Sequence, residues 1–478
     1  MRRNIIVKTD SYKLAHWQQY PPGTKFILSY LESRGGMFDE TVFFGLQYYL
    51  KEYLQGQVFT YNDITHAANL ANMHFVDQPN LFNAAGWERL LVKHSGRLPL
   101  RIKAIPEGTP VGIHNVLMTI ENTDPEFPWL TNVFETLLLK VWYPISVATL
   151  SREIKKHILQ NLIDTGDPST VDFKLQEFGY RGNTSEESAG IGGSAHLVNF
   201  KGTDTLAALE FVREYYSTHQ SYWKEPDIMP GFSVPASEHS TMTTWGPKGE
   251  VAAVENMLKA YPTGIVSIVG DSYDIYNFCQ EVIGGAVREQ ILNRNGKVVV
   301  RPDSGDPKSV VLACLNILGE RFGYETNSKG YKVLNPKVGI IQGDGMNYHT
   351  CRDLFNHLKA NGWSGDNLVI GMGGKLIQSV DRDTQKFAIK CSYAVIGETS
   401  MDVFKKPITD SGKDSKRGQL VLLRDSNGNY TTLTKRKDLE YTGDALVTVF
   451  EDGVLYNQVT FNQVRENARI EMAAQSAA

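Results

Sequence analysis

The segment IVSIVGDSYD, residues 265–274, begins as an apolar run and ends in a polar turn that carries Asp271. Three later segments repeat this arrangement: VVVRPDSGDP (298–307), VGIIQGDGM (338–346) and LVIGMGGK (368–375). Such apolar runs, separated by helical segments, are typical of parallel strands buried on both faces. Each repeat places polar or glycine-rich residues at the carboxyl end of a strand, which is the active-site face of an α/β barrel. The repetition therefore predicts a barrel with a functional site at that face.

The segments on either side of these repeats differ from them. Near the N-terminus we expect strands at 25–32, 98–104 and 111–120 and an aromatic-rich helix at 43–54. Near the C-terminus we expect hairpins at 419–434 and 446–458 and a helix at 461–474, with these β elements returning to the N-terminal sheet. The predicted fold class is α/β: an irregular, TIM-like barrel at 146–390 and a discontinuous α/β sandwich domain at 1–145 and 391–478.

Composition narrows the function classes. The chain has 478 residues, a formal net charge of −4 and 41% apolar residues, which is typical of a soluble globular protein. Without a basic excess we expect no nucleic-acid binding, and without a long apolar run or a signal segment we expect no membrane association. The cysteines have no C-x-x-C spacing, so they are expected to be reduced core thiols in a cytoplasmic protein.

One segment before the repeats, GFSVPASEHSTMTTW (231–245), brings together an acid, an imidazole and several hydroxyls. Ser237 is expected to cap a helix that begins at Glu238, which places His239 in the first turn. The helix dipole and the N-terminal amides favour an anion there. A histidine among hydroxyls suits phosphate or nucleophilic chemistry, although this stretch alone fits a helix-capping histidine equally well.

A strand expected at 171–178 ends in GYRG, where Arg181 can join backbone amides around an anion. Thr184 and Glu187 are expected to form the capping box of the helix that follows.

Three other polar residues have ordinary explanations when they are considered alone. Asp204, in KGTDT, is expected to cap a helix at 205–216. Tyr12, in DSYK, and Arg34, before two glycines, fit plain turn chemistry.

Taken together, these motifs resemble those of the nicotinamide phosphoribosyltransferase family. The matching segments are, in order, TDSYK, FGLQY, EFGYRG, VNFKGTDT, SVPASEHST, DSYDIYN, RPDSGDP, QGDG, GMGG and KCSY. The resemblance implies transfer of a phosphoribosyl group from phosphoribosyl pyrophosphate to nicotinamide, giving nicotinamide mononucleotide and pyrophosphate in NAD salvage. It also implies a homodimer with shared active sites, Mg²⁺ held mainly through the pyrophosphate, and ATP as a co-substrate that phosphorylates a histidine.

The resemblance also assigns roles to residues. It makes His239 the phosphohistidine and Asp303 the acid beside the ribose, while their position suggests Asp271 and Glu238 as acids that orient the histidine. The implied substrate-binding residues are Phe178, Arg181, Asp204, Arg301, Gly343, Asp344, Gly373, Gly374 and Arg382, with Tyr12, Arg34, Lys390 and Lys405 from the partner subunit. GMGGK departs from the family pattern at Met372 and Lys375, where Ser and Gly are expected.

Three other functions fit parts of the sequence. A nicotinate phosphoribosyltransferase would share the fold and the histidine, but Asp204 would repel a nicotinate carboxylate. A nucleotide sensor or scaffold would not need the complete set of acids, arginines and histidine. A metallohydrolase built on His239, Glu238 and Asp271 lacks a second histidine at ligand spacing.

Overall fold

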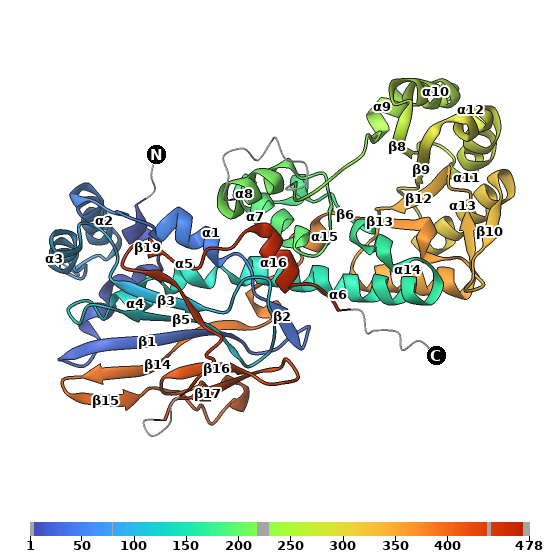
Figure 1. The fold of residues 1–478 in the computed structure, drawn as a ribbon. Coiled ribbons are helices and arrows are strands. Elements are labelled where there is room, and N and C mark those ends of the chain that lie inside the picture. Colours follow the sequence, from blue (N-terminus) through green and yellow to red (C-terminus); the bar gives the residue numbers. More distant parts are fainter. Residues whose placement is uncertain (1–3, 79, 218–228, 437–440, 472–478) are drawn as a thin grey trace. The chain divides into compact units, whose positions relative to one another are not determined.

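The structure is a computed structural model that describes residues 4–78, 80–217, 229–436 and 441–471 (Figure 1). Contacts between residues divide the chain into two units. Unit 1 takes in residues 1–149, 213–220 and 380–469, and unit 2 takes in 150–212, 221–379 and 470–478, as far as each range is described. The boundaries predicted from the sequence follow residues 145 and 390.

Unit 1 is built on an antiparallel sheet that joins the two ends of the chain (Figure 1). Its order within the described residues is β15 (Thr399–Asp402), β14 (Phe387–Ile396), β1 (Thr24–Ser33), β5 (Val116–Asn122), β3 (Leu100–Ala104), β18 (Val447–Glu451) and β19 (Val454–Leu455). In the middle of β1, the buried Tyr30 lies opposite Lys390 of β14 and Thr119 of β5. In this order, strands from the C-terminal part of the chain, β14 and β18, lie on either side of the N-terminal strands β1, β5 and β3.

Shorter elements complete unit 1. Two small antiparallel pairs are formed by β2 (Glu40–Val42) with β4 (Pro110–Gly112) and by β16 (Leu420–Arg424) with β17 (Tyr430–Thr434). The α-helices are α1 (Leu46–Tyr49), α2 (Tyr61–His74), α3 (Ala84–His94), α4 (Leu130–Val133), α5 (Glu135–Leu139) and α16 (Phe461–Asn467). The long helix α6 (Trp142–Thr165) begins in unit 1 and continues in unit 2.

Three expected elements of unit 1 differ from the structure. The single strand expected at 111–120 is two strands, β4 and β5, because the chain turns between them at His114, which has a φ of +62°. The helix expected at 43–54 begins at Leu46 and ends in a π-helical turn, η3 (Leu50–Leu54). Helix α16 ends at Asn467, well before the expected residue 474, which lies outside the described residues.

Unit 2 contains the predicted parallel strands. The order within the described residues is β7 (Gly202–Thr203), β6 (Leu175–Glu177), β13 (Leu368–Met372), β12 (Val338–Gln342), β9 (Asn295–Arg301) and β8 (Thr263–Val269). All of these strand pairings are parallel. The apolar side chains that the repeats supply, such as Val266, Ile268 and Val298, are fully buried. The strand runs read from the sequence are therefore confirmed.

Helices connect these strands. They are α7 (Glu186–Leu197), α8 (Leu206–Tyr216, which ends in unit 1), α9 (His239–Thr243), α10 (Glu250–Ala260), α11 (Ile275–Asn277), α12 (Arg288–Asn293), α13 (Pro307–Phe322), α14 (Tyr348–Ala360) and α15 (Gly374–Ile377). A π-helix, η8 (Phe278–Ala286), follows α11, and a small hairpin of β10 (Tyr324–Thr326) and β11 (Lys332–Leu334) follows α13.

The expected TIM-like barrel is found only in part. Within the described residues the parallel sheet has six strands, which form a half-barrel rather than the eight-stranded barrel of a TIM fold. Its two edge strands each pair with the same segment through a single bridge, Gly202 with Phe232 and Ala236 with Ser267. The fold is thus mixed α/β, with a parallel half-barrel sheet in one unit and antiparallel sheets in the other.

Two local expectations in unit 2 are wrong. The strand expected at 171–178 is only β6, because the Asp167 side chain caps a 3₁₀ turn, η4 (Pro168–Phe173), that occupies the first part. The capping box of α7 is formed by Ser185 and Ser188 rather than by Thr184 and Glu187.

The loop before β4 offers a test of how α16 packs in unit 1. Gly108 has a φ of +90°, and an added Cβ would overlap the carbonyl oxygen of Val464 in α16. Gly56 has a φ of +73° with no neighbouring atom within 4 Å of an added Cβ. Both alanine variants bear a left-handed strain of about 1–2 kcal/mol, but only Gly108→Ala must displace α16. We expect Gly108→Ala to lower the thermal unfolding midpoint clearly more than Gly56→Ala; equal shifts would contradict this packing.

Candidate active site

A pocket of about 920 Å³ lies in unit 2, where the parallel strands end. The lining residues lie at or just after the carboxyl ends of five strands or belong to α9 and its N-cap: Phe178, Tyr180, Arg181, Asp204, Thr205, Glu238, His239, Ser240, Arg301, Asp303, Gly343, Asp344, Gly371 and Gly373. Parallel pairing puts all the carboxyl ends at one edge of the sheet, which explains why residues so distant in sequence meet. Ten of the residues proposed from the sequence are in this lining.

His239 is the first residue of α9, and it is held by an acid from the neighbouring strand end. Its Nε2 lies 2.9 Å from Oδ1 of Asp271, which follows β8. The carboxylate is nearly buried, with 8% of the Asp271 side chain exposed, whereas 46% of the His239 side chain is exposed. An imidazole held in this way through one nitrogen can use the other as a nucleophile.

The local support of His239 differs from the expectation. Glu238, not Ser237, is the N-cap of α9, and it forms a capping box with Thr241. The Ser237 hydroxyl instead accepts a hydrogen bond of 2.9 Å from the backbone amide of Val269. Ser237 therefore fastens the histidine segment to β8.

Arg301, Asp303 and Asp344 lie at the ends of two adjacent strands, β9 and β12. Nη2 of Arg301 is 3.8 Å from Oδ2 of Asp303, and a Cβ added to Gly343 would lie 3.5 Å from Oδ1 of Asp303. Nε of Arg301 is buried and has no hydrogen-bond partner among the described residues. The arrangement places one guanidinium and two carboxylates on the same wall of the pocket.

Glycines make room for the aromatic ring and the arginine loop on another wall. An added Cβ at Gly371 would overlap the Phe178 ring, so only glycine lets the ring lie against β13. A Cβ added to Gly182 would lie 3.6 Å from Cα of Gly374, so the loop that carries Arg181 contacts the start of α15. Gly374 itself is adjacent to the lining residues rather than among them.

The two departures from the family pattern lie off the pocket wall. Met372 is 1% exposed, within β13, and Lys375 is exposed on α15. Neither residue belongs to the pocket lining.

Asp204 lines the pocket, and its carboxylate is oriented by a hydroxyl. The Ser233 hydroxyl donates a hydrogen bond to Oδ1 of Asp204. Helix α8 begins at Leu206 rather than at the expected Thr205. Thr205 therefore directly precedes the helix, and Asp204 does not occupy the predicted N-cap position. The sequence did not predict Ser233 as a site residue. Ser233 directly follows Phe232, which in the structure forms a bridge to Gly202 of β7.

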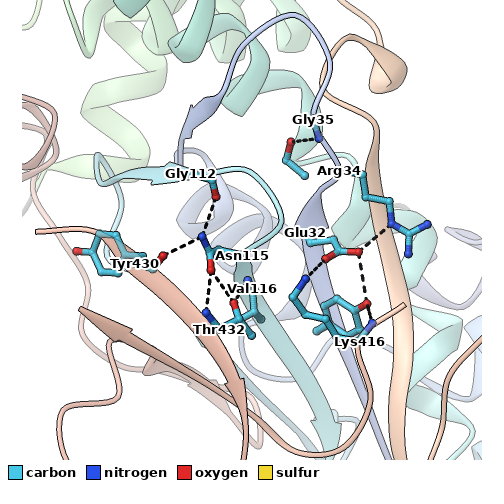
Figure 2. A network of polar contacts seen from close by, with 11 residues as sticks. Glu32, Arg34, Gly35, Gly112, Asn115, Val116, Lys416, Tyr430 and Thr432 are labelled. Carbon is cyan, nitrogen blue, oxygen red and sulfur yellow. Dashed lines mark hydrogen bonds and ion pairs between the residues drawn. The ribbon is translucent and has the colours of Figure 1, made fainter. Parts of the chain in front are cut away.

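Arg34 lies in unit 1, at the end of β1, in a network of buried charges (Figure 2). Its Nε donates a 2.8 Å hydrogen bond to Oε1 of Glu32, and Nζ of Lys416 donates one of 2.6 Å to Oε2. Nη2 of Arg34 is buried without a hydrogen-bond partner among the described residues. Tyr30, Glu32 and Arg34 alternate along the strand, and this period of two was the signal that could have identified Glu32.

Tyr12, Lys390 and Lys405 also belong to unit 1, and so does Arg382, which was predicted within the barrel domain at 146–390. Burial lowers the pKa of Lys390, the negative charge of Glu135 raises it, and the positive charges of Arg34, Lys405 and Lys13 lower it, so Lys390 lies within electrostatic range of these groups. Tyr12 is 58% exposed. Arg382 donates from Nη2 to Oδ1 of Asp383 at 2.9 Å. The structure thus gathers three of these cations in unit 1, while the pocket lining comes from unit 2.

Three further observations concern metals, thiols and membranes. The described part of the chain contains no group of three or more His, Cys, Asp or Glu side chains arranged to hold a metal ion. Cys279, Cys314 and Cys351 are buried free thiols, and Cys391 is a half-buried one. No helix in the described ranges is both long and apolar enough to cross a membrane.

Two family models match the chain. Residues 173–457 match the nicotinate phosphoribosyltransferase (NAPRTase) family, and residues 4–102 match the N-terminal domain of nicotinamide phosphoribosyltransferase. The first match spans the pocket residues, and the second spans Tyr12 and Arg34.

Two relatives align over nearly their whole length. A protein of Xanthomonas campestris pv. campestris named nicotinamide phosphoribosyltransferase is 49% identical, covering 97% of this chain and 98% of the relative. A protein of Acinetobacter baylyi with the same name is 32% identical, covering 97% of each chain.

Solved structures support the fold. The nicotinate-nucleotide pyrophosphorylase of Pyrococcus furiosus has a TM-score of 0.62 at 15% identity, covering 97% of this chain and 95% of that one. Human nicotinic acid phosphoribosyltransferase has a TM-score of 0.53 at 15% identity, covering 96% and 92%. With the family models and the full-length relatives, the conclusion is that the chain belongs to the nicotinate phosphoribosyltransferase family and, within it, to the nicotinamide phosphoribosyltransferases.

Proposed function

We propose that this protein transfers the phosphoribosyl group of phosphoribosyl pyrophosphate to nicotinamide, giving nicotinamide mononucleotide and pyrophosphate in NAD salvage. The observation that carries the proposal is the pocket that combines an aromatic ring, a carboxylate acceptor and two arginines: Phe178, Asp204, Arg181 and Arg301. The ring stacks on the pyridine, the carboxylate accepts from the carboxamide, and the arginines bind the diphosphate. The reduced thiols fit a cytoplasmic enzyme.

The charges in the pocket fit the transition state of this reaction. Breaking the anomeric C–O bond builds positive charge on the ribose and negative charge on the leaving pyrophosphate, and electrostatic stabilisation of both is the largest catalytic effect expected. Asp303 would stabilise the forming cation, and Arg181 and Arg301 the diphosphate. Gly343 and Asp344 would contact the ribose, while Gly373 and Gly374 would hold the 5′-phosphate through their amides.

The residues present also fit a magnesium ion that arrives with the diphosphate. Asp303 and Asp344 offer carboxylate oxygens on one wall of the pocket, and Mg²⁺ typically binds one or two carboxylates together with substrate phosphates. The ion would neutralise part of the diphosphate charge. Binding and orientation would remain the task of the arginines and the glycine-rich turns.

ATP use is a second part of the proposal. His239 is exposed, is held by Asp271 at 2.9 Å and stands beside Ser240 and Glu238 in the pocket, which supports its role as a phosphoryl acceptor. Glu238 and Asp271 would orient the imidazole. Phosphorylation would place negative charge among the arginines and so alter the affinity for phosphoribosyl pyrophosphate and pyrophosphate.

A homodimer with shared sites is the third part. Arg34, Lys390 and Lys405 form a cationic cluster in unit 1, and Nη2 of Arg34 still lacks an acceptor. An anion brought by the partner subunit's pocket would satisfy this cluster. Tyr12, which is exposed on the same unit, would cover the pyridine face opposite Phe178.

The base preference can be tested at Asp204. Two unit charges about 4 Å apart repel by roughly 4 kcal/mol at an effective dielectric of about 20, so Asp204 could discriminate against nicotinate by up to about a thousandfold. We expect Asp204→Ser to lower kcat/KM for nicotinamide and to narrow its advantage over nicotinate. Asp204→Asn is the matched control, because its oxygen can still accept from Ser233 while the charge is lost. A ratio of the two substrates that stays unchanged in both variants would refute this role of Asp204.

Phosphorylation can be tested at His239. The His239→Ala variant should lose both ATP stimulation and labelling by γ-phosphate-labelled ATP, because it lacks the nucleophilic nitrogen. Asp271→Asn should retain some labelling but at a lower rate, since the imidazole keeps a neighbour without the carboxylate charge. Full labelling of His239→Ala would show that another residue accepts the phosphate.

The shared site can be tested with two inactive variants. Asp303→Ala removes a group from the pocket of unit 2, and Lys390→Ala removes a cation from unit 1. In co-expressed mixed dimers one composite site should retain both groups, so part of the activity should return. Verified mixed dimers that stay inactive would contradict sharing between subunits.

A further inference from the structure

Glu177, the last residue of β6, is a fully buried carboxylate that contacts both neighbouring loops of the pocket. Its side chain accepts hydrogen bonds from the backbone amide of Gly179 and, at 2.8 Å, from the hydroxyl of Thr203. Its backbone oxygen accepts a bond of 3.0 Å from the amide of Asp204. One residue is thus fastened to the turn between Phe178 and Arg181 and to the turn that carries Asp204.

The hydroxyl of Thr203 accepts one hydrogen bond and donates another. The backbone amide of Thr205 donates to the Thr203 hydroxyl at 3.0 Å, so the hydroxyl proton is left to donate to Oε2 of Glu177. Asp204 lies between these two threonines. The position of its backbone therefore depends on a chain of bonds that ends at the buried carboxylate.

Packing holds the carboxylate in place. A Cβ added to Gly193 of α7 would lie 3.4 Å from Oε2, and one added to Gly179 would lie 2.8 Å from Oε1. Burial raises the pKa of Glu177, and the negative charge of Asp204 raises it further, while Thr205, the Gly179 amide and the Thr203 hydroxyl favour its charged form. A side chain so enclosed has little freedom to leave its donors, and a buried donor left without an acceptor is costly.

We propose that Glu177 is a positioning residue that, through the Thr203 hydroxyl, fixes Asp204 relative to Phe178 and Arg181 and so sets the preference for nicotinamide over nicotinate. This inference rests on the proposed function of the pocket. Two separate links follow from it. The hydrogen bond from Thr203 to Glu177 should affect the affinity for nicotinamide. The hydrogen bond from Gly179 should affect the loop that carries Arg181 and hence the affinity for phosphoribosyl pyrophosphate.

The first experiment compares Thr203→Val with Thr203→Ser. Valine has the shape of threonine but removes both hydrogen bonds of the hydroxyl, whereas serine keeps them. We expect Thr203→Val to raise KM for nicotinamide about tenfold, the effect of one hydrogen bond to a charged group, and to narrow the preference over nicotinate by a similar factor. KM for phosphoribosyl pyrophosphate should change less than about twofold in Thr203→Val. Thr203→Ser should keep the wild-type preference for nicotinamide over nicotinate.

The second experiment uses Glu177→Gln, which has the same shape but cannot accept from both donors as a carboxylate does. It should raise KM for nicotinamide and KM for phosphoribosyl pyrophosphate together, because both links are weakened. The double variant Glu177→Gln/Thr203→Val should raise KM for nicotinamide by no more than the stronger single variant, since both changes break one chain of bonds.

The outcomes separate this inference from the proposed function. Wild-type protein that does not use nicotinamide would overturn the function, whatever the variants do. Wild-type protein that prefers nicotinamide, with Thr203→Val only less stable and its substrate ratio unchanged, would overturn the positioning role. If Thr203→Val does not fold, Thr203→Ala removes the same hydroxyl with a smaller side chain. The preference of that variant for nicotinamide over nicotinate then tests the positioning role.

Discussion

The site depends on the parallel pairing of the strands in unit 2. In a parallel sheet all carboxyl ends lie at one edge, so residues that follow β6, β7, β9, β12 and β13 reach a common pocket. A single strand slipped by one residue would turn its core side chains to the opposite face. In β9, Val298 and Val300 are fully buried while Val299 between them is not, so this alternation fixes the register of the strand and with it the positions of Arg301 and Asp303.

A second feature shared by both units is the buried carboxylate with several donors. Glu177 accepts from Gly179 and Thr203, and Glu32 accepts from Arg34 and Lys416. Glu107, fully buried in unit 1, accepts from the amides of Gly45 and Gln47 and from the Tyr216 hydroxyl. An acid so placed is expensive to bury unless its oxygens are satisfied, so it orders the segments that supply the donors. At Glu177, these segments are the two turns of the pocket that carry Arg181 and Asp204.

Much of this arrangement could be predicted from the sequence, because local patterns determine it. Apolar runs that end in polar turns revealed β8, β9, β12 and β13, and the ends of the last three supply six of the fourteen pocket residues. Helix caps were harder to predict: Ser237 and Thr184 fit as caps by type and spacing, yet Glu238 and Ser185 fill those positions. Ser237 is used by the amide of Val269, a partner 32 residues away that no local pattern shows. Glu177 and Ser233 were missed for the same reason, since their partners Thr203 and Asp204 are 26 and 29 residues away.

The central claim is that the pocket selects nicotinamide as the acceptor of the phosphoribosyl group. The most direct measurement is kcat/KM of the purified full-length protein for nicotinamide and for nicotinate, with phosphoribosyl pyrophosphate and Mg²⁺, and with and without ATP. The account predicts formation of nicotinamide mononucleotide and pyrophosphate, with nicotinamide preferred by at least about tenfold, the effect of roughly 1.4 kcal/mol. Equal use of both bases, or a preference for nicotinate, would contradict it.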